Sequence, residues 1–320
     1  MHNKYCLKLP LNLFIICLII ISLNVSGITI NKSQQKFAVI IVGRYAGQWQ
    51  DVFPDNFQKY YGWYLNAAGM MYSTLRDTYD YSDESIFLLA TLRENYETPE
   101  SFNPEWVDFE SNKENLHDVL LSFKPGEKNW LKHQDSLLLC YINHGNDENS
   151  KKNGKYAHDT FFGFPYEFSN LHEIIRFFIL KQNTNDYRLY DWEFSEFCEN
   201  IYAGKMIFLL QPCNSGGFIN DLSGINRIIC TASREDEVAT VSWIEPIIRG
   251  LRGDAEANDD GRISILEAYE YAARKVLENT MNEHPLLDDN SDGIGHHFSE
   301  VGYNPCNPNN DGYLAARSFL

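Results

Sequence analysis

The stretch Lys205-Met206-Ile207-Phe208-Leu209-Leu210 is a short apolar run that stops at Gln211-Pro212-Cys213-Asn214-Ser215-Gly216-Gly217. An apolar run of this length, bounded by turn residues, predicts a buried strand followed by a tight turn. Cys213 would then lie at the carboxyl end of the strand, beside backbone N–H groups that the glycines leave accessible. Such a position suits a nucleophile.

Other short apolar runs have the same character, and helical patterns separate them. The predicted strands are 37–42, 85–89, 136–143, 205–210 and 227–232, and the predicted helices are 63–79, 171–180 and 191–202. Strands that are apolar throughout and alternate with helices predict an α/β fold, with a mostly parallel sheet covered on both faces. In such sheets the chemistry gathers at the carboxyl ends of the strands.

Between these elements, the polar stretch 146–158 is expected to form a surface loop. No domain boundary is expected before about Gly250. We therefore expect one catalytic domain over 28–250, with an acidic segment, 251–320, packed on it.

The first 27 residues have the pattern of a secretory signal. Lys4 and Lys8 precede an apolar stretch at 11–23, and small residues follow around Gly27. The apolar stretch is shorter than the roughly 20 residues that a membrane-spanning helix needs. We expect cleavage near Gly27 and a secreted or cell-envelope protein, with an uncleaved membrane anchor as the alternative.

Charge and cysteine content narrow the classes of partner and bond. The formal net charge of −17 over 320 residues argues against a nucleic-acid partner, because phosphates would be repelled. Five of the seven cysteines follow the signal segment. Cys140 and Cys230 lie in apolar runs and are expected to be buried thiols, whereas Cys198 and Cys306 could form a disulfide. The odd number leaves at least one thiol unpaired, and Cys213 is our candidate.

A second strand ends in the same way as the first. The run 136–143 stops at His144-Gly145. A thiol is mostly protonated at neutral pH, so a nucleophilic cysteine needs an adjacent imidazole or a positive field. The N–H groups of Gly145 and Cys213 could stabilise an oxyanion. A single Cys or His is usually structural, but two such residues at strand ends, each next to turn residues, favour a Cys213/His144 dyad for acyl transfer from an amide.

The sequence resembles a known family at these motifs. Asn143-His144-Gly145, with Gln211-Pro212-Cys213-Asn214-Ser215-Gly216-Gly217, is similar to the His-Gly and Glu-Ala-Cys-x-Ser-Gly-Ser signatures of legumain-like cysteine peptidases. Phe161-Phe162-Gly163-Phe164-Pro165 is similar to the Phe-Pro segment of that family. The resemblance extends over most of residues 37–245. It implies a caspase-like three-layer sandwich, a catalytic Cys213 and His144, and an oxyanion donor at Gly145.

The chain departs from the family pattern around the dyad. Asn143 stands where the family often has Asp, and Gln211-Pro212 replaces Glu-Ala. The basic residue of the family's asparagine-specific pocket has no clear counterpart near Trp63–Asn66. The loop Ser233–Glu237 follows a predicted strand and is expected to line the specificity pocket, and its mixed charges leave the preferred substrate residue open.

The acidic segment contains a possible calcium-binding loop. Its twelve residues begin at Glu256 and end at Glu267, with Gly261 at the sixth position. That spacing matches the calcium loop in which glycine makes the sharp turn and a final Glu binds through both oxygens. The candidate ligands are Glu256, Asn258, Asp260, Arg262 through its backbone, Ser264 and Glu267.

Two further fragments repeat part of this pattern, and both lack a carboxylate at position 12. In the first, Asp288, Asn290 and Asp292 precede Gly293, and a calcium site and a simple turn are equally good interpretations. In the second, Asn307–Gly312, we favour a turn. His296 and His297 have no spaced third ligand and give only weak evidence for zinc. We expect structural Ca²⁺ and no organic cofactor.

These expectations combine into one leading hypothesis. The chain is predicted to be a cysteine endopeptidase that acts on polypeptides, with Cys213 as nucleophile and His144 as general base and acid. A transpeptidase or transamidase would use the same dyad. An inactive, calcium-stabilised surface binding protein is the alternative from another class. The sequence leaves the oligomeric state open, and membrane contact would come only through an uncleaved signal segment.

Overall fold

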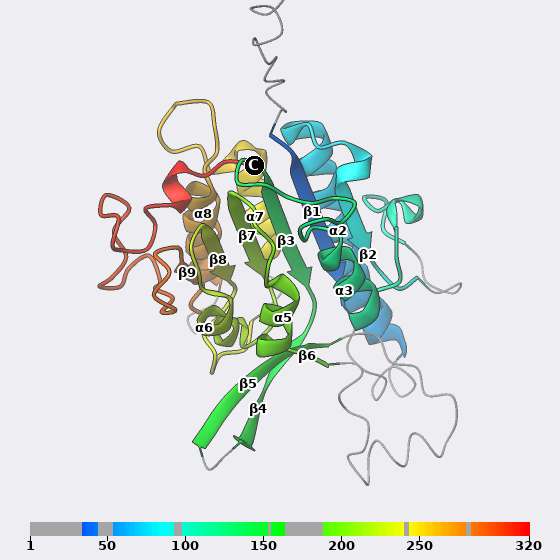
Figure 1. Ribbon diagram of the computed structural model, residues 1–320, viewed down its shortest axis with the longest axis horizontal. Coiled ribbons are helices and arrows are strands. Elements are labelled where there is room, and N and C mark those ends of the chain that lie inside the picture. Colours follow the sequence, from blue (N-terminus) through cyan, green and yellow to red (C-terminus); the bar gives the residue numbers. More distant parts are fainter. Residues whose placement is uncertain are drawn as a thin grey trace, which may run out of the picture. The chain divides into compact units, whose positions relative to one another are not determined.

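A mostly parallel β-sheet lies at the centre of the fold (Figure 1). The computed structural model describes residues 34–43, 54–92, 98–152, 155–163, 188–239, 243–279 and 283–320, and residues 35–320 belong to one compact unit. The predicted signal segment, the predicted helix 171–180 and Phe164-Pro165 lie outside the described residues.

The sheet has six strands in the order β2-β1-β3-β7-β8-β9. The strands are β1 (Lys36–Val42), β2 (Ile86–Leu89), β3 (Ser136–Ile142), β7 (Lys205–Leu210), β8 (Arg227–Thr231) and β9 (Leu286–Asp288). The first five in spatial order are parallel, and β9 pairs antiparallel with β8. The predicted α/β fold with a mostly parallel sheet is thus confirmed, and β9 brings the acidic segment into the sheet.

Helices cover both faces of the sheet, because each strand is apolar on both sides. Ile40, Cys140 and Leu209 belong to one apolar core, which includes α2 (Pro54–Tyr79), α7 (Ile244–Arg249) and α8 (Ile265–Asn279). Val39 and Phe208 belong to the other, with α3 (Lys113–Leu121), α5 (Asp191–Cys198) and α6 (Ile219–Leu222). Every residue of β3 is buried, so this strand is central to both cores.

The predicted element boundaries differ from the structure in two helices. The helix predicted at 63–79 begins at Pro54, a residue whose fixed φ suits the first helical turn. The helix predicted at 191–202 ends at Cys198, because Glu199 is extended and Asn200 has φ +62°. Single turns of 3₁₀ helix lie at Asp83–Ser85, Pro104–Trp106, Ser215–Phe218 and Ala315–Arg317, and a π-helical turn lies at Gly250–Asp254.

The surface loop predicted at 146–158 is wrong. This part of the chain forms β4 (Gly145–Lys152) and β5 (Lys155–Gly163), an antiparallel pair that β6 (Arg188–Tyr190) extends to three strands. A backbone ladder needs no apolar side chains, so a polar sequence does not exclude it. The signal was present: Lys152 pairs with Lys155, and Asn153-Gly154 between them is a strong hairpin sequence.

The environments of the cysteines agree in part with the predictions from the sequence. Cys140 and Cys230 are completely buried, as predicted. Cys198 and Cys306 do not form a disulfide: Cys198 is buried at the end of α5, whereas Cys306 is exposed. No helix within the described residues is long and apolar enough to span a membrane.

Candidate functional site

The pairing of β3 with β7 determines where the two predicted catalytic residues lie. Tyr141 and Leu210 are register partners in this parallel pair, and the Gln211 N–H extends the ladder to the Tyr141 carbonyl at 3.0 Å. His144 and Cys213 each follow that pair by three residues. Both residues therefore leave the sheet at the same edge, where β3 continues into β4 (Figure 1).

Cys213 is half-buried at this edge. Its thiol donates a hydrogen bond to the Ala239 carbonyl oxygen at 3.3 Å. Burial raises the pKa of the Cys213 thiol, and hydrogen bonding to backbone groups of Ala239, Cys213 itself and Gly145 opposes that rise. The backbone of Gly145, next to His144, is thus near enough to the sulfur to affect its pKa. The thiol is the resting form at neutral pH.

His144 also has a perturbed environment. Its Nε2 lies 3.0 Å from the hydroxyl oxygen of Tyr64, a residue of α2, and the two rings meet edge to face. Burial lowers the pKa of His144, because the imidazolium form loses hydration. The resting pair at neutral pH is therefore a neutral imidazole and a thiol, which suits a base that takes the proton as the sulfur attacks.

A hydrogen bond between strand ends supports the position of His144. The Gln211 Oε1 atom accepts from the Asn143 N–H at 3.1 Å, and both residues are buried. These are two of the positions at which the sequence departs from the legumain-like pattern. The amide of Gln211 thus supplies an acceptor without placing a buried negative charge beside the dyad.

The turn after Cys213 is fixed by close packing. Asn214 adopts the left-handed conformation, with φ +59°. A Cβ on Gly216 would lie 2.8 Å from the Glu235 nitrogen, so only glycine fits there. The Gly217 N–H already donates to the Asn214 carbonyl. The prediction that these glycines leave N–H groups accessible therefore fails for Gly217, and Gly145 and Cys213 remain the candidate oxyanion donors.

The predicted specificity loop Ser233–Glu237 lies beside this turn. The Asn214 side chain donates to the Glu235 carbonyl at 2.7 Å, and the Asn214 N–H donates to the Glu237 carbonyl at 2.8 Å. Glu237 also contacts Nδ1 of His284 at 2.6 Å. The loop is thus held between the turn that follows Cys213 and the C-terminal segment. This position is compatible with a loop that lines a substrate site.

Three of the six ligands predicted for the calcium loop 256–267 are exposed, namely Asn258, Asp260 and Arg262. Glu256, Asn258 and Asp260 each accept a hydrogen bond from the backbone N–H two residues later. Glu267 accepts through Oε2 from the Ser264 N–H and hydroxyl, and its Oε1 is buried without a hydrogen-bond partner. Arg262 is exposed, and its guanidinium lies over the Phe319 ring.

The other acidic fragments differ from one another. Asp288 is 1 % exposed, and neither of its carboxylate oxygens has a hydrogen-bond partner. Asp311, in the fragment interpreted as a turn, instead contacts His296 Nδ1 at 2.6 Å and accepts from the Asp289 N–H. His297 is paired with Ser299, so the two histidines have separate partners. No group of three or more His, Cys, Asp or Glu side chains within the described ranges is arranged to hold a metal.

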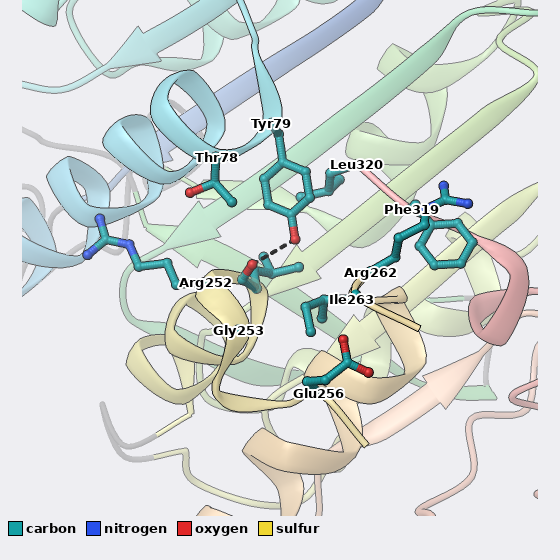
Figure 2. A pocket seen from close by; sticks show the side chains of 11 residues that line it. Thr78, Tyr79, Arg252, Gly253, Glu256, Arg262, Ile263, Phe319 and Leu320 are labelled. Carbon is teal, nitrogen blue, oxygen red and sulfur yellow. Dashed lines mark hydrogen bonds between the residues drawn. The ribbon is translucent and has the colours of Figure 1, made fainter. Parts of the chain in front are cut away.

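A cavity of about 350 Å³ is lined by the end of α2 and by residues of the C-terminal segment (Figure 2). Tyr79 lines it and donates to the Leu251 carbonyl at 2.7 Å. The Tyr79 carbonyl also accepts from Lys36, the first residue of β1, so the cavity is near the amino end of that strand. It contains none of the predicted catalytic residues.

Comparison of the sequence with models of known protein families finds no match, and comparison with curated proteins finds none either.

Sequence reasoning did not assign a role to Tyr64 or to the Gln211 amide. Tyr64 lies in a predicted helix, and no spacing in the sequence pairs it with His144. Gln211 was visible only as a departure from the family motif. Its partner is a backbone N–H, which carries no sequence signal of its own.

Proposed function

We propose that the protein is a secreted or cell-envelope cysteine endopeptidase with a caspase-like fold. The observation that carries the proposal is the register of β3 and β7. Tyr141 and Leu210 are partners in this register, and His144 and Cys213 each follow that pair by three residues at the same edge of the sheet. The effect of the Gly145 backbone on the Cys213 sulfur supports it. The motif resemblance to legumain-like peptidases is an independent argument from sequence.

The dyad would hydrolyse a peptide bond in two stages. The Cys213 sulfur bonds to the carbonyl carbon while its proton passes to His144, and the N–H groups of Gly145 and Cys213 hold the oxyanion. The C–N bond then breaks, and the leaving amine takes the proton from His144. Water, deprotonated by the same imidazole, hydrolyses the thioester and restores the thiol. An amine in place of water would give transpeptidation, and no feature of the site favours it.

The raised pKa of Cys213 favours one alternative, an inactive calcium-stabilised binding protein. A half-buried thiol with few thiolate molecules at neutral pH reacts slowly with alkylating agents. Labelling with iodoacetamide distinguishes the two hypotheses. The peptidase hypothesis expects Cys213 to be labelled before the buried Cys140 and Cys230, whereas equal resistance of all three favours the binding protein.

The direct test is cleavage of a peptide library by the purified chain. Cys213→Ala should abolish cleavage, because the variant has no nucleophile. Cys306→Ala is the matched control, because Cys306 is an exposed free thiol to which no catalytic role is assigned. Wild-type cleavage rates in the Cys213→Ala variant would refute the proposal.

A further inference from the structure

The loop that follows β9 contains a buried carboxylate that hydrogen bonding does not satisfy. Asp288 ends β9, opposite Ile229 of β8, and is 1 % exposed. Neither carboxylate oxygen has a hydrogen-bond partner, and Asp288 is the one side chain in the described ranges with two such buried atoms. A buried charge without a partner is strongly unfavourable, so such groups are usually paired or bind a metal.

Ordinary turn formation does not explain this carboxylate. Asn290 and Asp292 each accept from the N–H two residues later, at 2.9 and 2.8 Å, as turn-forming side chains do. Asp288 makes no such bond. Its neighbour Asp289 shows how a buried acid is satisfied in this segment, because it accepts from the N–H groups of Gly312 and Ala315.

The groups around Asp288 converge on one place. The Ser223 hydroxyl, the Ser291 backbone and the Asp292 carboxylate all lie near the Asp288 carboxylate, but none of them forms a hydrogen bond of good geometry with it. Ser223 follows α6 and accepts from the Gly293 N–H at 3.1 Å. Gly293 has φ +77°, and a Cβ there would lie 3.9 Å from the Asn220 carbonyl oxygen. The Asp288 carboxylate of the loop and the Ser223 hydroxyl at the end of α6 are therefore neighbouring oxygen groups.

We propose that this place is a calcium site, formed by Asp288, Asn290 and Asp292 of the loop together with Ser223 of the α6 segment. Carboxylate, amide and hydroxyl oxygens are the ligands that Ca²⁺ prefers, and alternate ligands before a glycine at position 6 match its loop. Ser223 supplies an oxygen from outside the loop, which compensates for the missing carboxylate at position 12. The chain's net charge of −17 also attracts cations.

The site would link the sheet edge to the segment after the nucleophile. Ser223 follows Cys213 by ten residues, through the 3₁₀ turn Ser215–Phe218 and α6. Asp288 belongs to β9, which pairs with β8. A bound cation would thus join two segments that are distant in sequence, and its effect should be on stability whether or not the protein is a peptidase.

The test is calcium titration of the EDTA-treated full chain by calorimetry, with the melting temperature measured in parallel. Asp288→Asn and Asp292→Asn should each lose one bound Ca²⁺ per chain. Asp292 is exposed, so its substitution leaves folding intact. Asp260→Asn is the matched control in the other acidic loop, and it should retain this Ca²⁺. Saturating Ca²⁺ should raise the wild-type melting temperature by on the order of 5 °C.

The melting temperature of the Asp288→Asn variant separates calcium binding from a purely structural role of Asp288. In EDTA its melting temperature should equal or exceed that of the wild type, because the substitution removes an uncompensated buried charge. In Ca²⁺ it should fall below the wild type. The proposal is overturned if both loop variants bind as many calcium ions as the wild type, or if Mg²⁺ at equal concentration replaces Ca²⁺.

Discussion

Tyr64→Phe removes the hydroxyl that contacts His144 and leaves the ring in place. The structure gives a 3.0 Å contact between the Tyr64 oxygen and Nε2, and Tyr64 is 4 % exposed, so the ring is held by packing. Because Nε2 contacts Tyr64, we expect Nδ1 to take the thiol proton. That step needs the tautomer that carries hydrogen on Nε2, which donates to the tyrosine oxygen.

The hydrogen bond between Tyr64 and His144 determines how Tyr64→Phe changes kcat/KM and the pKa of His144. It persists when His144 becomes an imidazolium, and it is stronger with the charged ring. The difference between a bond to the charged ring and a bond to the neutral ring is about 1–1.5 kcal/mol, which corresponds to a loss of about 5- to 13-fold in kcat/KM. Removing it lowers the pKa of His144 further. Activity is present above that pKa and is lost as pH falls through it, so the acid limb should move to lower pH.

The assay is the pH profile of kcat/KM for a cleaved peptide. Tyr61→Phe is the matched control, because Tyr61 lies in the same helix, is equally buried and donates to the Thr91 carbonyl instead. It should leave the acid limb unchanged. NMR titration of His144 in a Cys213→Ala chain measures the same pKa without activity. An acid limb that moves to higher pH in Tyr64→Phe would refute the reasoning, because it would require the opposite tautomer.

Three further predictions follow, two for residues around Cys213 and His144 and one for the buried His297. Gln211→Ala takes away the acceptor of the buried Asn143 N–H and should cost about 1–3 kcal/mol in urea unfolding, whereas Gln211→Glu keeps an acceptor oxygen and should restore part of any lost activity. Gly216→Ala forces a Cβ to within 2.8 Å of the Glu235 nitrogen, so it should cost about 1–3 kcal/mol and lower activity; wild-type unfolding would contradict the packing. Burial lowers the pKa of His297 to about 4, so the wild-type protein should lose stability as pH falls from 6.5 toward 4. His297→Asn should reduce that loss by at most about 3 kcal/mol. An unchanged pH dependence of the unfolding free energy in the variant would contradict this prediction.

The sequence predicted the sheet better than what surrounds it. The run 205–210 is a strand with the predicted bounds, because apolar runs between turn residues have few alternatives. The polar hairpin β4–β5 was missed because backbone pairing holds it, and periodicity detects only side-chain burial. The strand β9 was also missed: Leu286–Asp288 is three residues long, too short for any pattern.

The candidate site divides along similar lines. The placement of Cys213 and His144 after the ends of neighbouring strands was predictable, because each ends an apolar run beside turn residues. Tyr64 was not, because its contact with His144 joins residues 80 positions apart through the packing of α2 on the sheet. The acidic loops share the spacing of their first ligands and of the glycine, but only the structure shows that Asp288 is buried while Asp260 is exposed. Burial of a carboxylate depends on neighbours such as Ser223, which no local pattern specifies.

The central claim is that Cys213 forms the acyl-enzyme. A peptide substrate mixed with the full chain and quenched in acid within one turnover should leave an acyl group on a single cysteine, identified by mass spectrometry of the digested chain. The account predicts a thioester on Cys213 that hydroxylamine removes. Continued cleavage with no acyl group on Cys213, or with the acyl group on another residue, would contradict it.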